Sequence, residues 1–300
     1  MADDRLAGQQ AAGPLPGGLP IAGEPVPIFS FANGELGFLQ NRAIRLIERL
    51  TGQPRIKKLY LDYVDDQRPP SRFWQDALDR LHIRLDVTKE AGAEIPESGP
   101  LLVIANHPFG VVDGVALCAL IAEKRQDYKM ITHRVLRQAP AVMDKILPID
   151  FDEDEKALAN NLATRKQALA WLDTGGVLVI FPSGAISRSP DFFGPARDPE
   201  WKKFVAKLAK KPGVSVLPVH FTGQNSVLFQ MAIRASLTLG YALMFREICQ
   251  QMHRRLPVTI RRLIRPADIA SIDSRSDLVS FLRARTYGLA EDSQPAKEER

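Results

Sequence analysis

The sequence predicts an α/β fold with a mostly parallel central sheet, helices on both faces, and an N-terminal pair of helices before it. Short apolar runs with the length of buried strands alternate with longer segments in which apolar residues recur at helical spacing. Glycine and proline mark strand ends, as at Gly99, Pro100 and Pro182. The chain has 300 residues, 45% of them hydrophobic, which is enough for a sizeable core. Strands separated by helices in this way form parallel sheets that are covered on both faces.

The two ends of the chain are expected to lie outside the folded part. Residues 1–27 are rich in glycine, alanine and proline, and predict a flexible or extended arm. Residues 291–300 are mostly polar and charged, and predict a disordered tail. Between them, residues 28–81 are expected to be an N-terminal helical region and residues 82–290 the α/β domain.

The expected elements follow from periodicity and length. In the N-terminal region, helices are expected over about 36–50 and 71–81. In the α/β domain, the expected strands are 83–88, 101–105, 128–132, 177–181, 214–219 and 258–262. The expected helices of that domain are 115–123, 156–173, 201–209 and 237–252. In such sheets ligands bind at the carboxyl ends of the strands, so the residues after each strand are the first candidates for a site.

Composition limits the choice of function. The net charge of +5 is too small to indicate nucleic acid by itself, and basic residues are not interleaved with aromatic ones. The two cysteines, Cys118 and Cys249, lie in apolar helical patterns and predict a reducing, cytoplasmic compartment. No signal sequence is evident, and no apolar run approaches the roughly 20 residues of a membrane span. No histidine or cysteine spacing is typical of a metal site.

The segment 106–114, Asn-His-Pro-Phe-Gly-Val-Val-Asp-Gly, carries the first candidate site. It follows a buried strand and places His107 and Asp113 a short turn apart. An imidazole can take a proton from a hydroxyl as that oxygen attacks a carbonyl group. A carboxylate on the other ring nitrogen would hold the tautomer and stabilise the imidazolium. The alternative is a structural histidine, with Asp113 as an ordinary helix cap.

A second candidate follows the expected strand 177–181. The segment 181–188 reads Phe-Pro-Ser-Gly-Ala-Ile-Ser-Arg, and its proline and glycine force a turn. Ser187 and Arg188 offer donors to a phosphate or an oxyanion. The alternative is a plain turn with a solvated arginine. The segment is not the nucleophile elbow of serine hydrolases, because a proline precedes Ser183 and a glycine follows it directly.

Together with residues 216–219, Val-Leu-Pro-Val, these segments resemble the PlsC-like glycerolipid acyltransferase superfamily, which includes the lysophospholipid acyltransferases. Residues 106–114 look like the family's His/Asp block and residues 181–184 like its Phe-Pro-Glu-Gly block. Residues 216–219 look like its final block, usually an apolar-Pro-apolar turn. The order and separations of the blocks match, and the resemblance spans about residues 81–264.

Details of two segments look closest to the hemolysin-like branch of the family, which includes the acyltransferase half of bifunctional ornithine-lipid synthases. They are Asn106-His107-Pro108 and residues 223–226, Gly-Gln-Asn-Ser. Two departures stand out. Five residues separate His107 from Asp113, as in that branch, where the common block has four. Ser183 replaces the usual glutamate. We expect Gly110 to absorb the extra residue in a tight bend that leaves His107 and Asp113 within hydrogen-bonding reach.

The resemblance implies transfer of a fatty acyl group from acyl-ACP or acyl-CoA to the hydroxyl of a lysolipid, either a lysophospholipid or a lyso-amino-acid lipid. It implies His107 as the general base and Asp113 as the residue that orients it. A thioester is already activated, so no cofactor and no metal are implied. The residues implied in substrate binding are Asn106, Gly110, Ser183, Gly184, Ser187, Arg188 and Pro218. Among them, Arg188 is the candidate for an anionic head group, and amides around Gly110 and Gly184 are candidates for oxyanion donors.

Such an acceptor implies a peripheral enzyme on the inner face of the cell membrane. The N-terminal helices are the expected membrane contact because they precede the alternating core, whereas most of the apolar stretch 228–252 is expected to pack on the sheet. Two alternatives stay open. One is an N-acyltransferase that acts on an amino-acid amine. The other is a non-catalytic, membrane-associated lipid-binding protein that keeps the fold.

Overall fold

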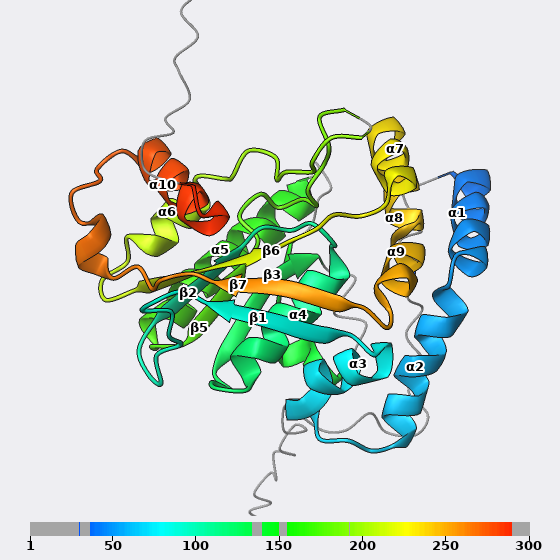
Figure 1. Cartoon of the computed structure of the whole chain (residues 1–300), viewed down its shortest axis with the longest axis horizontal. Coiled ribbons are helices and arrows are strands. Elements are labelled where there is room, and N and C mark those ends of the chain that lie inside the picture. Colours follow the sequence, from blue (N-terminus) through cyan, green and yellow to red (C-terminus); the bar gives the residue numbers. More distant parts are fainter. Residues whose placement is uncertain (1–29, 31–36, 134–139, 150–154, 192, 290–300) are drawn as a thin grey trace, which may run out of the picture.

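The computed structural model of the chain describes residue 30 and residues 37–133, 140–149, 155–191 and 193–289. The expected arm (1–27) and tail (291–300) lie outside the described residues. A seven-stranded sheet with strand order β1-β7-β6-β2-β5-β3-β4 forms the centre (Figure 1). Its strands are β1 (Arg84–Lys89), β2 (Leu101–Ala105), β3 (Tyr128–His133), β4 (Ile146–Ile149), β5 (Val177–Ile180), β6 (Ser215–Phe221) and β7 (Arg255–Ile260). Neighbouring strands are parallel except β6 and β7, so β1 and β7 run against the rest.

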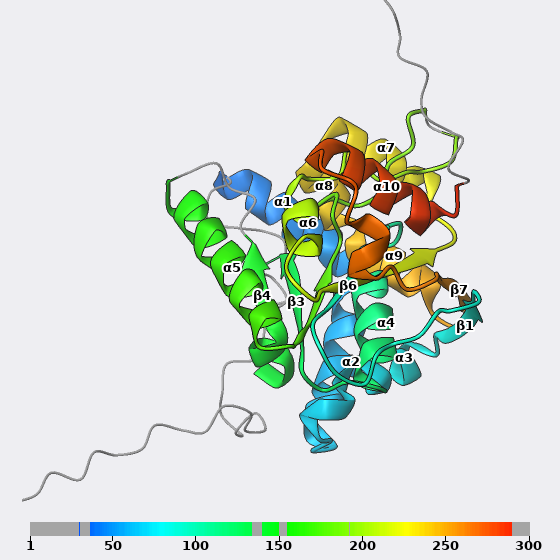
Figure 2. The same cartoon turned by 90° about the vertical axis from the view of Figure 1, so that its left-hand side faces the viewer.

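Helices cover both faces of the sheet, as the sequence predicts (Figure 1 and Figure 2). The helices are α1 (Phe38–Leu50), α2 (Gln53–Asp65), α3 (Phe73–Leu81), α4 (Val111–Ala122), α5 (Glu155–Asp173), α6 (Phe204–Ala209), α7 (Val227–Ala235), α8 (Leu237–Ala242), α9 (Met244–Gln251) and α10 (Arg275–Tyr287). One apolar core includes residues of α2, α3, α4, α7 and α9. A second core, on the other face, includes residues of α5, α6 and α10.

Strand β2 lies at the centre of the sheet, and its sequence explains why. All of its side chains are fully buried. Because successive side chains of a strand point to opposite faces, Leu101, Val103 and Ala105 join one core, and Leu102 and Ile104 join the other. A strand covered on both faces has no solvent side, so an unbroken apolar run is the pattern that fits it.

Several elements differ from the prediction. Both expected N-terminal helices are present, as α1 and α3, and α2, which the sequence did not predict, lies between them. The expected helix 237–252 is interrupted, because α8 ends at Ala242 and α9 begins at Met244. Helices α7 and α10 and strand β4 were not predicted. The expected helix at 115 begins earlier, at Val111, directly after Gly110.

Pro218 lies inside β6, within the strand expected over residues 214–219, and not in the turn that is usual for the family's final block. Val216 pairs with Ile264 and Val219 pairs with Ile260, so the strand opposite Pro218 carries one extra residue. This is a β-bulge, a place where a sheet accepts a proline because the ladder is already interrupted. On its other side Pro218 lies opposite Ile104 of β2, in the interior of the sheet.

Candidate active site

The sequence blocks meet at one edge of the sheet because β5, β2 and β6 are neighbours and run in the same direction. Asn106 and His107 follow β2, and Phe181 follows β5. The Asn106 side chain joins the ends of two strands. Its Nδ2 donates to the carbonyl oxygen of Phe221 at 2.9 Å, and the Phe221 amide donates to its Oδ1 at 2.7 Å. Both polar atoms of this buried side chain are therefore used within the protein, which assigns Asn106 to the frame of the site.

His107 and Asp113 lie together, and the bend expected at Gly110 is confirmed. Gly110 has φ +76° and ψ −112°, a conformation that side-chain-bearing residues rarely adopt. The bend brings His107 Nδ1 to 3.1 Å from Asp113 Oδ2. The ring N–H does not point along that line, so the pair is at hydrogen-bonding distance without an aligned hydrogen bond. Catalytic hydrogen bonds are often poorly aligned before substrate binds.

The Asp113 carboxylate is completely buried and also caps α4. Its Oδ2 accepts hydrogen bonds from the amides of Phe109 at 2.8 Å and Gly110 at 2.9 Å. Burial raises the pKa of Asp113, and the contacts with His107 and the two amides oppose part of that rise. The catalytic and capping interpretations of Asp113 are thus compatible, because one oxygen serves both the histidine and the turn before the helix.

The imidazole of His107 lies between Asp113 and an aromatic wall. Its ring stacks on Phe181 with 3.9 Å between the ring centres and 24° between the planes. Phe181 belongs to the second sequence block, so that block contributes directly to the surroundings of the histidine. The His107 side chain keeps 18% of its surface exposed, whereas Asp113 keeps none. The histidine is therefore the member of the pair that solvent, and hence a substrate, can reach.

The second block supplies fewer free groups than the sequence suggests. The Ser183 hydroxyl donates to the Ala185 carbonyl at 2.8 Å and the Ser187 hydroxyl donates to Asp198 Oδ1 at 2.5 Å. The Gly184 amide donates to the Phe181 carbonyl at 2.9 Å. Since the Gly110 amide donates to Asp113, both of these glycine amides already have partners within the protein.

Arg188 is the residue of this block with an uncommitted polar atom. Its main chain pairs with Arg197 through hydrogen bonds of 2.9 and 3.0 Å. Its Nε is buried and has no hydrogen-bond partner among the described residues. Burial raises the pKa of Tyr241 on α8, and the Arg188 guanidinium lowers it in part, so the arginine's charge lies near that helix. A cationic group thus lies one residue beyond Ser187, whose amide donates to the His107 carbonyl at 2.8 Å.

Sequence reasoning missed one residue that contacts the histidine. Asp198 accepts a hydrogen bond from the backbone amide of His107 at 3.0 Å and is only 3% exposed. It stands in the polar loop that leads to α6, where no periodic pattern or known block marks it. Only the fold brings residues 107 and 198 together.

Other basic residues that follow or flank β3 are only partly described. Lys129 lies over the Trp171 ring at 4.7 Å, which accounts for its charge through a cation–π contact. Arg134 and Arg137 lie outside the described residues.

His82 stacks on His253 with 4.6 Å between the ring centres. In the described part of the chain, no group of three or more His, Cys, Asp or Glu side chains could hold a metal ion.

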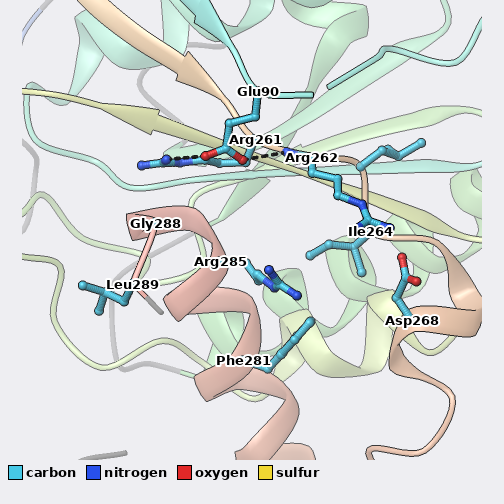
Figure 3. A pocket seen from close by; sticks show the side chains of 10 residues that line it. Glu90, Arg261, Arg262, Ile264, Asp268, Phe281, Arg285, Gly288 and Leu289 are labelled. Atoms are coloured by element: carbon cyan, nitrogen blue, oxygen red, sulfur yellow. Dashed lines mark hydrogen bonds and ion pairs between the residues drawn. The ribbon is translucent and has the colours of Figure 1, made fainter. Parts of the chain in front are cut away.

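A cavity of about 380 Å³ lies away from His107, between the residues that follow β7 and helix α10 (Figure 3). Charged residues line much of it, among them Glu90, Arg261, Arg262 and Arg285. Glu90 accepts from Arg261 Nη1 at 2.6 Å and from the Arg262 amide at 3.1 Å. None of the site residues expected from the sequence lines this cavity.

Comparisons with known proteins relate the chain to acyltransferases. A model of the Acyltransferase family matches residues 86–222, a range that includes His107, Asp113, Arg188 and Pro218. The lyso-glycine lipid O-acyltransferase of Phocaeicola vulgatus is 25% identical over 228 residues, which cover 70% of this chain and 79% of that protein. The protein of the same name from Bacteroides thetaiotaomicron is 26% identical over 228 residues and is covered to 81%.

Among solved structures, the 1-acyl-sn-glycerophosphate (LPA) acyltransferase PlsC from Thermotoga maritima aligns over 83% of this chain and 87% of its own. The TM-score is 0.46 and the identity 19%. The family match and the names of the curated relatives support an acyltransferase of the PlsC-like superfamily.

Proposed function

We propose that this acyltransferase moves a fatty acyl group from a thioester, acyl-ACP or acyl-CoA, to the hydroxyl of a lysolipid. The observation that carries the proposal is the 3.1 Å approach of His107 to the buried Asp113 at the carboxyl end of β2. The two curated relatives are named for a lyso-glycine lipid, which favours a lyso-amino-acid lipid over a lysophospholipid as the acceptor.

In the proposed reaction His107 acts as a general base through Nε2. Its Nδ1 is buried against Asp113, so Nε2 is the nitrogen that an acceptor hydroxyl can meet. The hydroxyl oxygen attacks the thioester carbon while Nε2 takes its proton. The tetrahedral intermediate then collapses, the carbon–sulfur bond breaks, and the leaving thiolate takes the proton from the imidazolium. An ester and a free thiol result, and His107 returns to its starting state.

Asp113 supports this cycle from behind the ring. A carboxylate at Nδ1 holds the proton on that nitrogen and leaves Nε2 free to act as a base. When the imidazolium forms, the buried negative charge stabilises it more strongly than an exposed charge would. Phe181 limits the movement of the ring by stacking on it.

Arg188 is the proposed contact for the acceptor's head group. Its buried Nε lacks a partner among the described residues, and such a donor is stabilised when an anion fills the gap. A guanidinium binds a carboxylate or a phosphate through paired hydrogen bonds. The amino-acid carboxylate of a lyso-amino-acid lipid provides that geometry. Ser187, which precedes Arg188 in the chain, donates its amide to the His107 carbonyl. A head group bound to Arg188 would therefore lie at the same end of the sheet as the base.

The proposed location is the inner face of a membrane, reached through exposed apolar side chains on α1, α7 and α8. Helix α1 exposes Phe38, Leu39, Leu46 and Leu50, with Leu39 at 80%, and also exposes three arginines, Arg42, Arg45 and Arg49. Apolar side chains beside arginines are typical of helices that lie in the interface of an anionic membrane. None of the described helices has the length and apolarity to cross a bilayer.

Helices α7 and α8 extend this surface. Figure 1 shows α1 beside the stack of α7, α8 and α9. The stretch 228–252 packs inward through Phe229, Ile233, Phe245 and Ile248, as expected for most of it. The same stretch keeps Leu228, Met231, Leu237 and Leu239 partly exposed, next to Val227. We call the exposed apolar side chains of α1, α7 and α8 the apolar surface.

The function is tested by product formation. Purified protein is incubated with palmitoyl-CoA or palmitoyl-ACP and with lyso-glycine lipid or lysophosphatidic acid, and the products are identified by mass spectrometry. We expect an O-acyl ester from the wild type and a loss of about 10²–10⁴-fold in His107→Ala, the usual contribution of a general base. No ester with any of the four pairs, or full activity in His107→Ala, would contradict the proposal. An amide formed from a free amino acid would favour the N-acyltransferase alternative.

A further inference from the structure

The carboxylate of Asp198 gathers three hydrogen-bond donors from three parts of the chain. Its Oδ1 accepts from the His107 amide at 3.0 Å and from the Ser187 hydroxyl at 2.5 Å. Its Oδ2 accepts from the indole Nε1 of Trp201 at 2.9 Å. Asp198 is 3% exposed and Trp201 is 1% exposed, so water does not compete for these bonds. A buried carboxylate whose two oxygens both accept hydrogen bonds holds those donors in a fixed arrangement.

The main chain of His107 is held on both sides by this arrangement. Its amide donates to Asp198, and its carbonyl accepts from the Ser187 amide at 2.8 Å. Because Ser187 also donates its hydroxyl to Asp198, the three residues form a closed ring of hydrogen bonds. A displacement of the carboxylate would therefore move the peptide that carries the imidazole.

Asp198 is itself anchored through its main chain. Its amide donates to the phenolic oxygen of Tyr287 at 3.1 Å, and its carbonyl accepts from Arg283 Nη2 at 2.8 Å. Both partners lie on α10, the helix that also borders the cavity in Figure 3. Arg261 fixes the end of that helix by donating to the carbonyl of Thr286 at 3.3 Å and binding Glu90 at 2.6 Å. The carboxylate thus projects from a supported backbone.

We propose that Asp198 is a positioning residue for the acyl-transfer reaction, and that its carboxylate sets the place of the His107 main chain relative to Asp113 and to the acceptor. The proposal rests on the proposed role of His107 as the base. A displacement of about 1 Å at a reacting group can lower a rate about a hundredfold, so the hydrogen-bond ring has a direct kinetic consequence.

The closed ring of hydrogen bonds predicts that loss of the Asp198 carboxylate affects kcat and KM to different extents. Residues 188 and 197 are paired through their main chains, next to the side-chain bond between Ser187 and Asp198. A change confined to the Asp198 carboxylate leaves that backbone pair in place, and with it the proposed head-group contact at Arg188. Loss of the carboxylate should therefore lower kcat much more than it changes KM for the lysolipid.

The test is a double-mutant cycle on Asp198 and Trp201. In Asp198→Asn the side chain gains an NH₂ group, which faces either the Trp201 indole N–H or the His107 amide, and so opposes a donor with a donor. We expect kcat to fall about 30- to 100-fold with lyso-glycine lipid and palmitoyl-CoA, with KM changed less than threefold. Trp201→Phe removes the opposing indole donor. The double variant Asp198→Asn/Trp201→Phe should therefore recover at least fivefold in kcat over Asp198→Asn alone.

Controls separate this role from simple stabilisation. Asp76 on α3 is also a buried carboxylate, 2% exposed, beside Arg68 and Arg72 and outside the blocks that form the site. Asp76→Asn should lower the thermal midpoint and leave kcat of the folded enzyme unchanged. If Asp198→Asn behaves like Asp76→Asn, with a lower midpoint and kcat within twofold of wild type, the inference is overturned.

A milder variant covers the case in which Asp198→Asn does not fold. Ser187→Ala removes one bond of the ring and keeps the carboxylate with its other donors. It should lower kcat about three- to tenfold, and unchanged kcat in this variant would also overturn the inference. The parallel measurement on His107→Ala distinguishes the two proposals. Activity retained without His107 removes the proposed function, whereas an inactive His107→Ala beside fully active Asp198 and Ser187 variants removes only the role of Asp198.

Discussion

One oxygen of Asp113 lies 3.1 Å from His107 Nδ1 and also accepts hydrogen bonds from the amides of Phe109 and Gly110. An asparagine at this position can still accept from the two amides, but it has no charge to stabilise an imidazolium. We expect Asp113→Asn to lower kcat on the order of 10²–10⁴-fold while the fold is kept. The measurement is ester formation at saturating palmitoyl-CoA, with circular dichroism as the check on folding. Activity within threefold of wild type would exclude Asp113 from the mechanism.

The same substitution should not cost stability at neutral pH. Burial raises the pKa of Asp113 in the folded state above its value in the unfolded chain. A carboxyl group whose pKa is raised by folding makes the folded protein less stable as the pH rises from the pKa of the unfolded state to that of the folded state. The reason is that the group ionises more easily in the unfolded chain. We therefore expect Asp113→Asn to melt at the same or a higher temperature than wild type near pH 7, with the difference shrinking as the pH falls below the ordinary aspartate range. A clearly lower midpoint at neutral pH would contradict this.

Gly110 should tolerate no side chain. A Cβ atom there would lie 2.9 Å from Ile186 Cδ1 and 3.1 Å from Met244 Sδ, at a φ of +76°. Gly110→Ala should therefore destabilise by more than the roughly 1–2 kcal/mol of backbone strain alone and should lower activity, because the bend places Asp113. Gly99→Ala is the matched control, since Gly99 has φ +85° but open space around its Cβ position. Chemical denaturation of both variants measures the difference, and equal losses would count against the steric argument.

Membrane binding should depend on the apolar surface. Leu39 and Leu46 of α1 are 80% and 58% exposed, so glutamates at these positions do not disturb the core. A leucine side chain that becomes buried in the membrane contributes about 1.5–3 kcal/mol to the free energy of binding. Leu39→Glu/Leu46→Glu should therefore lower binding to phosphatidylglycerol-containing vesicles at least tenfold. Leu289→Glu, two residues beyond the end of α10, is the control for a single added glutamate outside the apolar surface, and it is compared with Leu39→Glu alone. Equal binding by all variants in a sedimentation assay would show that α1 does not contact the bilayer.

Arg125 offers a test of stability without function. Its buried guanidinium donates to Asp127 and to the carbonyls of Pro96, Gly99 and Gly175, which lie near the amino ends of β2 and β5, opposite the site. A lysine cannot reproduce this fork of bonds. Arg125→Lys should lower the free energy of unfolding by about 2–4 kcal/mol and leave kcat of the folded enzyme unchanged. A loss of kcat at a temperature where the variant is folded would contradict the separation.

The sequence was sufficient for the longer buried strands and insufficient for a short strand and several helices. Strand β2 is an unbroken apolar run, and its bounds agree with the prediction. Helix α2 carries many charged residues and buries only Tyr60 and Tyr63, so its periodicity is weak. Helix α10 does carry a start signal in the sequence, because the Ser274 side chain accepts a hydrogen bond from the amide of Asp277. Strand β4 has only four residues, one of them a proline, which is too short for a pattern.

In the site, too, contacts between residues close in the sequence could be predicted, and contacts between distant residues could not. His107 and Asp113 are six positions apart, so the bend between them could be predicted from Gly110. The partner of Asn106 is a main-chain group at residue 221, which no residue type marks. Asp198 contacts His107 across 91 positions through a loop whose course depends on α6 and α10. Contacts of this kind follow from the fold and leave no trace in spacing.

The N-terminal helices share a core with the catalytic sheet. Trp74 of α3 is 2% exposed and donates to the hydroxyl of Tyr128 in β3 at 2.6 Å, and Tyr60 and Leu78 join the same apolar cluster as β2. A shortened chain that begins at residue 82 would leave this face of α4 and β3 uncovered and the Tyr128 hydroxyl without its donor. The smallest fragment that can fold and retain acyl transfer should therefore include α2 and α3, which makes the helical region a part of the enzyme and not a detachable anchor.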